Sequence, residues 1–372
     1  MHARYFVGVD LGAGSGAKLG LFDTELNLIG EGILPISGIT GFEELSNKLK
    51  KAIESLNPHA CSKHEFIASV GLASPGLFAS DGTYIIAANL GFLNGRNLRQ
   101  ELSDKLYVPV GIVNDADAGG LAAWHMKQEE LLYWVFGGGW GGAWISADGK
   151  VIHPAVDWDR KDSSLHPTNE PGYAVPIPLE RVKYFLDSLT MDSNSFSRDT
   201  YKVFIENLIK EFNGMPLEPS DDDKSLRAEA LVSGTGMLRL FKALTHHVSH
   251  YYRDVLTGKD AEGKDIDPGR RIDELAKQHN IYALKTHELF GSFLGIAGAQ
   301  ILDAVAAETK EVIPVYLAGK PSKAYPYFIE SALDQIIING HRNKIMPIDA
   351  TGKLGNPNLI GAAVKAKQVY EE

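Results

Sequence analysis

Residues 5–23 read YFVGVDLGAGSGAKLGLFD, and their pattern predicts a hairpin built around a glycine-rich turn. The segments 5–10 and 18–23 alternate or run apolar, as strands do. In and beside the turn lie Asp10, Gly12, Gly14 and Lys18. Glycines let the backbone turn sharply and direct successive amide groups at an anion, so the turn is a candidate phosphate site. An ordinary hairpin loop explains the same residues equally well.

The turn does not match two common nucleotide-binding motifs. A Rossmann fingerprint and a P-loop both open a helix, whereas a strand pattern follows here. A third strand near 28–36 and an amphipathic helix over 41–56 come next. Strand and helix patterns continue to alternate along the chain, so the predicted fold class is α/β.

The remaining elements are predicted from apolar periodicity and turn residues. Strands are expected at 66–76, 108–115 and 312–319, with a second glycine hairpin over 131–152. Helices are expected at 97–106, from Asp117, and at 178–189, 197–212, 236–252, 286–308, 324–337 and 359–370. A polar stretch over 257–271 is interpreted as an exposed loop.

The second glycine turn, FGGGWGGAW over 136–144, is richer in glycine than a hairpin requires. Each glycine costs about 0.5–1 kcal/mol of chain entropy relative to alanine. A close approach of the backbone to a ligand would explain that cost. Two such turns, one opening each half of the chain, suggest a duplicated architecture.

Between the two turns lies VNDAD, residues 113–117, at the end of a buried strand. A carboxylate held there could accept a hydroxyl proton while that oxygen attacks phosphorus, which makes Asp115 a candidate base. The neighbouring Asn114 could orient the substrate. For Asp117 we favour a plain structural role as a helix N-cap.

Composition narrows the class of protein. The formal net charge of −10 argues against a general nucleic-acid binder, because affinity for phosphate backbones comes from clustered Lys and Arg. No uninterrupted apolar run approaches the roughly 20 residues of a membrane-spanning helix. The N-terminus enters a strand pattern at once, so we expect no leader and a cytoplasmic protein. The single Cys61 excludes an internal disulfide.

Several motifs follow one another in a familiar order: GLASPG, NLGF, VNDADAGG, FGGGWGGAWI, EPGY, SGTGMLRLFKAL, YLAG and LIGAA. With the opening turn, this order resembles the bacterial glucokinases and the wider ROK sugar kinases of the actin-like, hexokinase-like ATPase superfamily. The resemblance runs over nearly the whole chain. Its most specific pieces are the Asn114–Asp115 pair and the run that begins at Ser233.

The resemblance implies a role for each motif residue. Asp115 would be the catalytic base, and Asp10 would help to hold Mg²⁺. The ATP phosphates would lie near Gly12, Gly14, Lys18, Gly137, Gly138 and Gly139. The adenine would lie near Gly234, Thr235 and Gly319. Sugar hydroxyls would be bound by Asn89, Asn114, Glu170, Tyr173 and Glu229. From the residues alone, the two glutamates are as easily loop and helix-surface charges.

Two further features bear on specificity and metal binding. Tyr173 stands where glucokinases have a histidine, which favours another hexose or an amino sugar. His246 and His250 share a helix face, but no carboxylate completes an HExxH pattern, so a solvated helix surface is the better interpretation.

The resemblance predicts the two-lobed actin-like ATPase (ribonuclease H-like) fold with a duplicated core. The smaller lobe would comprise 1–118 plus 359–372, and the larger 119–358. The expected function is ATP-dependent phosphorylation of a hexose, glucose or a related sugar, with a homodimer allowed and no nucleic-acid or membrane partner. The alternatives are an inactive sugar- or nucleotide-binding protein of this fold and a kinase for a non-sugar acceptor.

Overall fold

The structure is a computed structural model, and the chain divides into two compact units. It describes residues 3–12, 16–56, 65–87, 90–154, 166–182, 184–185, 225–245, 255, 257–259, 267–348 and 355–372. The first unit comprises Met1–Tyr133, Gly142–Leu165 and Thr351–Glu372, and the second comprises Trp134–Gly141 and His166–Ala350.

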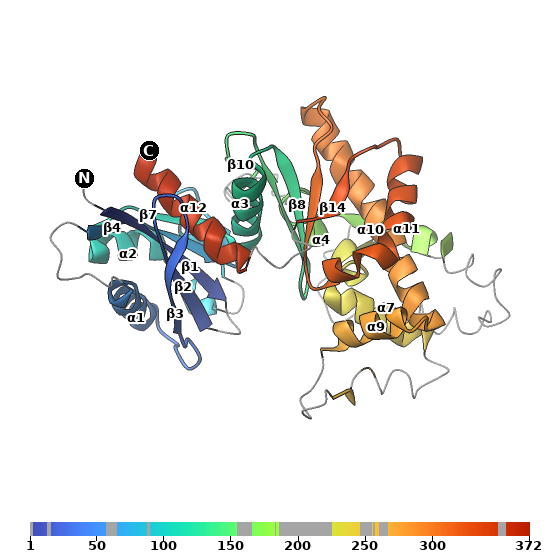
Figure 1. Ribbon diagram of the computed structural model, residues 1–372, viewed down its shortest axis with the longest axis horizontal. Helices are drawn as coiled ribbons and strands as arrows, with labels where there is room; N and C mark the ends of the chain where they lie inside the picture. The colour runs from blue at the N-terminus through green and yellow to red at the C-terminus, as the bar shows by residue number, and fades with distance from the viewer. Residues whose placement is uncertain are drawn as a thin grey trace. The chain divides into compact units, whose positions relative to one another are not determined.

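The first unit contains a five-stranded sheet with the order β3-β2-β1-β4-β7 (Figure 1). Its strands are β1 (Ala3–Gly12), β2 (Gly16–Phe22), β3 (Leu28–Leu34), β4 (Glu65–Ser74) and β7 (Val110–Asn114). The first three strands pair antiparallel, and β4 and β7 continue the sheet in parallel. The hairpin predicted from the opening glycine turn is confirmed, with Asp10 opposite Lys18 and Gly12 opposite Gly16.

Successive residues of β1 point to opposite faces of this sheet. Val7, Val9 and Leu11 enter a core cluster with α1 (Phe42–Ser55) and α2 (Leu98–Leu106). Phe6 enters another cluster, together with Leu359 and Ala363 of α12 (Pro357–Glu371). Asp10 therefore lies on the face of β1 that carries α12.

Helix α12 packs on the sheet and on α3 (Asp115–Lys127), and Figure 1 shows it in red against the blue strands. Glycines make this approach close. A Cβ at Gly71 would lie 1.8 Å from the Ala362 carbonyl oxygen, and a Cβ at Gly361 would lie 1.7 Å from that of Ala118. The small connecting elements of this unit are β5 (Leu77–Phe78), β6 (Tyr84–Ile86) and the 3₁₀ helix η1 (Gly91–Leu93).

A second five-stranded sheet has the order β10-β9-β8-β13-β14. Its strands are β8 (Leu131–Phe136), β9 (Trp140–Ile145), β10 (Val151–Ile152), β13 (Val315–Gly319) and β14 (Ile345–Pro347). The serial order of its strands repeats that of the first sheet, so the predicted duplication of the core is confirmed.

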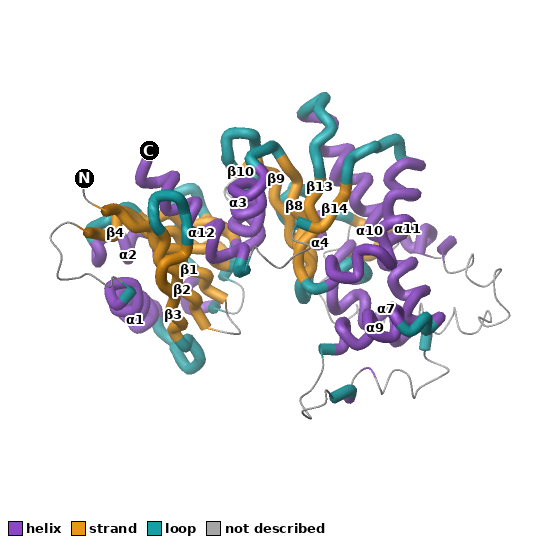
Figure 2. Tube along the Cα trace, in the orientation of Figure 1, coloured by secondary structure: helices purple, strands orange, loops and turns teal. Residues whose placement is uncertain are grey.

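The elements not yet named lie in the second unit and are mainly helical (Figure 2). They are α4 (Pro171–Ala174), α7 (Gly234–Leu244), α9 (Pro268–Lys277), α10 (Ile281–Glu308) and α11 (Tyr325–Ile338), with the short pieces β11 (Pro176–Pro178), β12 (Ser225–Arg227), η2 (Ala228–Ala230) and η3 (Pro321–Ala324). Helices α10 and α11 run side by side.

Helix α10 changes one expectation from the sequence. Its 28 residues are long and apolar enough to cross a membrane by length and composition alone, with a mean hydropathy of 1.6. In the structure most of its side chains are buried, as in the core helix of a folded protein. The helix predicted at 286–308 lies within α10, which begins earlier, at Ile281.

One further expectation differs from the structure. The predicted loop over 257–271 contains the start of α9, whose Asp267 caps the helix through Arg270 N. The expected lobes, 1–118 plus 359–372 and 119–358, stay a prediction. The helix predicted at 197–212, and most of that at 178–189, lies outside the described residues.

Candidate functional site

Asp115 lies at the junction between β7 and α3. The preceding residue, Asn114, is the N-cap of α3, and its Oδ1 accepts a hydrogen bond from Ala116 N at 2.8 Å. Its Nδ2 donates to the Gly76 carbonyl oxygen at 3.0 Å. Asn114 thus fixes the junction that presents Asp115. The expectation that Asp117 caps this helix is wrong, since Asp117 lies buried in its first turn.

The surroundings of Asp115 favour its protonated form. Burial raises the pKa of this carboxyl above its usual value, and the nearby charge of Asp10 raises it further. The Ala116 backbone N–H, 3.1 Å from Oδ1, acts in the opposite direction by stabilising the carboxylate. A carboxylate whose proton affinity is raised in this way suits the acceptance of a hydroxyl proton.

Asp10 lies on β1, between Lys18 of β2 and Ala73 of β4. The residue is 9% exposed. Asn356 Nδ2 donates to Oδ2 at 3.0 Å, and Asn358 Nδ2 lies 3.5 Å from Oδ1. Within the described ranges, no lysine or arginine forms an ion pair with Asp10. A carboxylate without a protein counter-charge is a suitable oxygen ligand for a divalent cation such as Mg²⁺.

Two buried tyrosines lie near these carboxylates in the first unit. Tyr84 donates a hydrogen bond from its hydroxyl to Ser74 Oγ at 2.9 Å. The Tyr133 hydroxyl has no hydrogen-bond partner in the described part of the chain, although the ring is fully buried. A Cβ at Gly119, one helical turn after Asp115, would lie 2.7 Å from that hydroxyl. Burial raises the pKa of Tyr133, and the charge of Asp115 adds to this effect.

In the second unit, the β8–β9 turn is tied to the start of α7. Gly137 O accepts from Gly234 N at 2.9 Å, and Gly138 O accepts from Thr235 Oγ1 at 3.0 Å. Ser233 caps α7, since its Oγ accepts from Gly236 N at 2.8 Å. The turn and the helix N-terminus, which were predicted to bind ATP, therefore form one hydrogen-bonded structure. A helix N-terminus carries partial positive charge and suits an anion.

Glu229 lies beside this turn. A Cβ at Gly139 would lie 2.7 Å from Glu229 Oε2, so this position requires glycine while the carboxylate stays in place. Burial raises the pKa of Glu229, and the charges of Arg227 and Arg239 lower it. The Arg227 guanidinium lies 3.4 Å from the ring centroid of Tyr173, in a cation–π contact. Glu229 and Tyr173 are thus connected through Arg227.

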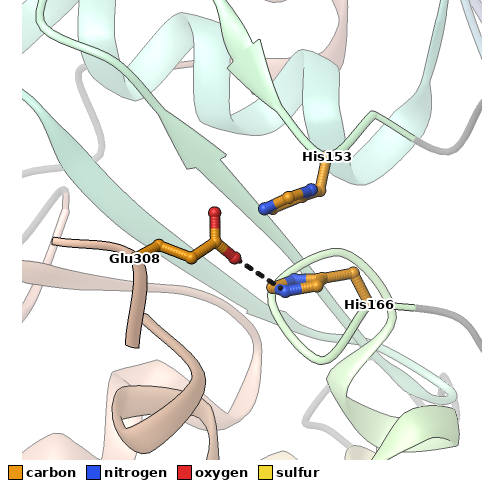
Figure 3. Close-up of side chains that lie close together, drawn as sticks. All are labelled: His153, His166 and Glu308. Carbon is orange, nitrogen blue, oxygen red and sulfur yellow. Dashed lines mark ion pairs between the residues drawn. The ribbon is translucent and has the colours of Figure 1, made fainter. Parts of the chain in front are cut away.

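Glu170 follows a turn that begins at His166. Glu170 N donates to His166 O at 3.3 Å, and Thr168 N lies 3.3 Å from His166 Nδ1. Figure 3 shows His166 Nε2 paired with the Glu308 carboxylate, 3.3 Å away at the end of α10. The turn before Glu170 is thus anchored to α10.

Gly319 ends β13 with φ +86°, a conformation that favours glycine. A Cβ here would lie 2.0 Å from the Phe136 carbonyl oxygen. The following Lys320 forms an exposed ion pair with Asp267, 2.7 Å away. Gly319 therefore forms a tight backbone turn, and its place beside the adenine stays a prediction.

The structure brings the predicted residues into two groups, each within one unit. The first group comprises Asp10, Gly12, Lys18, Asn114 and Asp115, and the second Glu170, Tyr173, Glu229, Gly137, Gly138, Gly139, Gly234, Thr235 and Gly319. Gly14, Asn89 and the three histidines at 246, 247 and 250 lie outside the described residues.

Sequence reasoning missed four residues that contact these groups: Asn356, Asn358, Arg227 and Tyr133. The segment GNPN at 355–358 carries one recognisable signal, an asparagine N-cap followed by proline at the first helical position. That signal predicts the start of a helix but not a contact with Asp10. Arg227 and Tyr133 carry no such signal.

Comparison with known proteins agrees with this architecture. Residues 6–155 match the model of the ROK family, which confirms the predicted resemblance over that part of the chain. The chain superimposes on a ROK family glucokinase from Streptomyces griseus in complex with glucose and AMPPNP, with a TM-score of 0.62, 16% identity and coverage of 98% of this chain and 99% of the other. For a ROK hexokinase from Thermus thermophilus the TM-score is 0.63 at 19% identity, with 97% of each chain covered. The chain thus has the actin-like ATPase fold of these ROK proteins.

A more similar sequence covers less of the chain. An N-acetyl-D-glucosamine kinase from Erwinia tasmaniensis is 35% identical over 152 residues, which are 40% of this chain and 48% of the relative. The chain thus matches about half the length of that relative.

Proposed function

We propose that this protein is an ATP-dependent sugar kinase in which Asp115 is the catalytic base. The observation that carries the proposal is the placement of Asp115 at the β7–α3 junction. There the Asn114 cap holds it, and burial and Asp10 raise its proton affinity. The resemblance to ROK kinases in sequence and fold supports the same assignment.

In the proposed step, a sugar hydroxyl oxygen forms a bond to the γ-phosphorus of ATP. The bond from that phosphorus to the bridging oxygen breaks, and ADP leaves. The hydroxyl proton passes to a carboxylate oxygen of Asp115. Because the transition state of phosphoryl transfer carries spread-out charge, most of the catalysis is positioning and electrostatic stabilisation.

Each group by itself supplies candidate ligands for part of the donor. The β8–β9 turn with the N-terminus of α7 would bind phosphate oxygens through backbone amides, and Gly319 would leave room for the adenine. Asp10 is the ligand proposed for Mg²⁺, because its buried carboxylate has only neutral partners among the described residues. When bound, the cation would neutralise charge on the phosphate oxygens.

The proposed acceptor is a hexose or an N-acetylated amino sugar. Glu170, Glu229, Asn114 and Asn89 are the proposed hydroxyl-binding residues, and Tyr173 is the proposed selectivity residue. N-acetyl-D-glucosamine is the first candidate, because the relative from Erwinia tasmaniensis is named as a kinase for that sugar. Glucose and mannose are the other members of the class to be compared.

A coupled ADP-release assay over these sugars tests the proposal, with Asp115→Asn beside the wild type. Loss of the base should lower kcat by about 10²–10⁴-fold, with little change in sugar binding. Asp104→Asn, an exposed carboxylate on α2 of the same unit, is the matched control and should keep wild-type turnover. An Asp115→Asn variant with near wild-type turnover would contradict the assignment.

The Asp115→Asn variant has a second readout, its melting temperature, which should rise whereas its turnover falls. Because the pKa of Asp115 is raised in the folded protein, its charged form costs stability above that pKa and costs nothing below the ordinary value of 3.8. The asparagine variant should therefore melt at a higher temperature than wild type at neutral pH, and the gain should shrink as the pH falls.

A wild type that binds sugar in calorimetry but releases no ADP would favour the inactive binding protein instead.

A further inference from the structure

The carboxylate of Asp10 is held by the segment that opens α12, far away in the sequence. Asn356 Nδ2 donates to Oδ2 at 3.0 Å, over a separation of 346 residues, and Asn358 Nδ2 lies 3.5 Å from Oδ1. Phe6, Gly8 and Asp10 share one face of β1, and α12 covers that face. The contact is therefore a consequence of strand periodicity and not a chance approach of surface side chains.

In the described part of the chain, the side chains that hydrogen-bond to Asp10 are the neutral amides of Asn356 and Asn358. An amide N–H occupies a lone pair of the carboxylate without cancelling its charge, whereas lysine or arginine would cancel it. A carboxylate offers about four lone-pair sites, so two amide donors leave further sites open. The two amides therefore orient Asp10 and, among the described residues, leave carboxylate lone pairs for a cation.

The position of the amide donors is fixed by backbone packing. Asn356 also caps α12, since its Oδ1 accepts from Leu359 N at 3.4 Å. A Cβ at Gly8 of β1 would lie 2.4 Å from the Leu359 carbonyl oxygen, so strand and helix backbones are in direct contact. At Gly361 the same helix touches the backbone of α3, which begins with Asp115. One helix thus contacts both elements that carry the proposed catalytic carboxylates.

We infer that Asn356 and Asn358 are positioning residues that orient the Asp10 carboxylate for the divalent cation accompanying the phosphate donor. This inference rests on the proposed function. Residues that hydrogen-bond to a metal ligand typically account for about 10–100-fold in metal affinity.

The test is Mn²⁺ binding in the presence of AMPPNP, followed by electron paramagnetic resonance of the free ion. Asn356→Ser keeps an oxygen that can cap α12 but loses the amide that reaches Asp10. The apparent dissociation constant for Mn²⁺ should rise by about tenfold or more. Asn358→Ala, which removes no cap, should change it in the same direction and keeps the test decisive if Asn356→Ser fails to fold. The KM for sugar at saturating Mg²⁺ should stay at the wild-type value.

Asn97→Ser is the matched control. Asn97 caps α2 in the same unit through Gln100 N, and its Nδ2 donates to Asp81 O at 2.9 Å, so it makes the same two kinds of bond away from Asp10. It should lower the melting temperature as Asn356→Ser does but leave Mn²⁺ binding unchanged. If the Asn356 and Asn358 variants fold and bind Mn²⁺ as the wild type does, the inference is overturned, but the proposed function is not. A wild type that neither binds Mn²⁺ with AMPPNP nor releases ADP would overturn the proposed function as well.

Discussion

At the scale of single residues, Tyr84 and Tyr133 form an instructive pair. Both are almost fully buried in the first unit, and they differ in the hydrogen bonding of their hydroxyl groups. Tyr84 donates to Ser74 at 2.9 Å, whereas Tyr133 has no partner among the described residues. A buried polar group without a partner costs about 1–3 kcal/mol, while a satisfied one contributes about 1 kcal/mol.

Replacing each tyrosine with phenylalanine should therefore change stability in opposite directions. Tyr133→Phe should raise the free energy of unfolding by about 1 kcal/mol, and Tyr84→Phe should lower it by a similar amount. Chemical denaturation of both variants and the wild type measures the two differences. A loss of stability in Tyr133→Phe would mean that the hydroxyl has a partner, such as a buried water.

The sequence was informative at this scale only where a side chain follows a local pattern. Asp10 and Asp115 could be selected as candidates because each ends an apolar strand beside a turn. Asn356 could not be connected with Asp10, because that contact depends on the fold of all intervening residues. Asp117 was assigned wrongly as a cap because Asn114, three positions earlier, is an equally good capping residue and starts the helix sooner.

At the scale of elements, the packing of α12 on α3 depends on glycine at position 361. Alanine is the better helix former by about 1 kcal/mol, so propensity alone would favour a substitution here. However, the added Cβ would lie 1.7 Å from the Ala118 carbonyl oxygen, and backbone cannot move aside as a flexible side chain can. The steric clash outweighs the gain in helix propensity, so the substitution should lower the free energy of unfolding.

Gly361→Ala should lower the free energy of unfolding by about 1–3 kcal/mol, the usual cost of overpacking. Gly30→Ala on β3 is the control, because its Cβ would meet only the Leu21 Cβ at an ordinary 3.7 Å. Thermal denaturation should show a lower midpoint for the first variant and an almost unchanged midpoint for the second. Equal midpoints would contradict the close packing of α12 on α3.

Most elements could be predicted because their periodicity is local. The hairpin of β1 and β2, helix α1 and helix α11 all lie close to their expected bounds. Helix α9 was missed because its exposed face is densely charged, so only Ile272 and Ala276 are buried and the apolar signal is thin. The pairing of strands between distant segments came from the family resemblance and not from periodicity.

At the scale of the whole molecule, the first unit is formed by segments that are far apart in the sequence. The first unit is built from three segments, of which Thr351–Glu372 is the last. The core of α12 is shared with Phe6 and Phe22. The early segments of the unit therefore cannot bury one face of their sheet without that last segment.

Deleting residues 355–372 should destabilise the first unit selectively. In hydrogen–deuterium exchange followed by mass spectrometry, peptides from β1, β4 and α3 should lose protection, whereas α10 and α11 should keep it, because they pack on each other. Removing only the exposed Glu371 and Glu372 is the control and should leave exchange unchanged. Retained protection in β1 after the longer deletion would contradict the role given to α12.

The separation of Asp10 and Asn356 in the sequence also determines when each side of the first sheet can be covered during synthesis on the ribosome. The two residues are separated by 346 positions, which take about 20–70 seconds to synthesise at typical elongation rates. During that interval β1 exists as nascent chain while the helix that covers its second face has not been made. The apolar side chains Phe6 and Phe22 can be covered by Leu359 and Ala363 only after α12 has been synthesised.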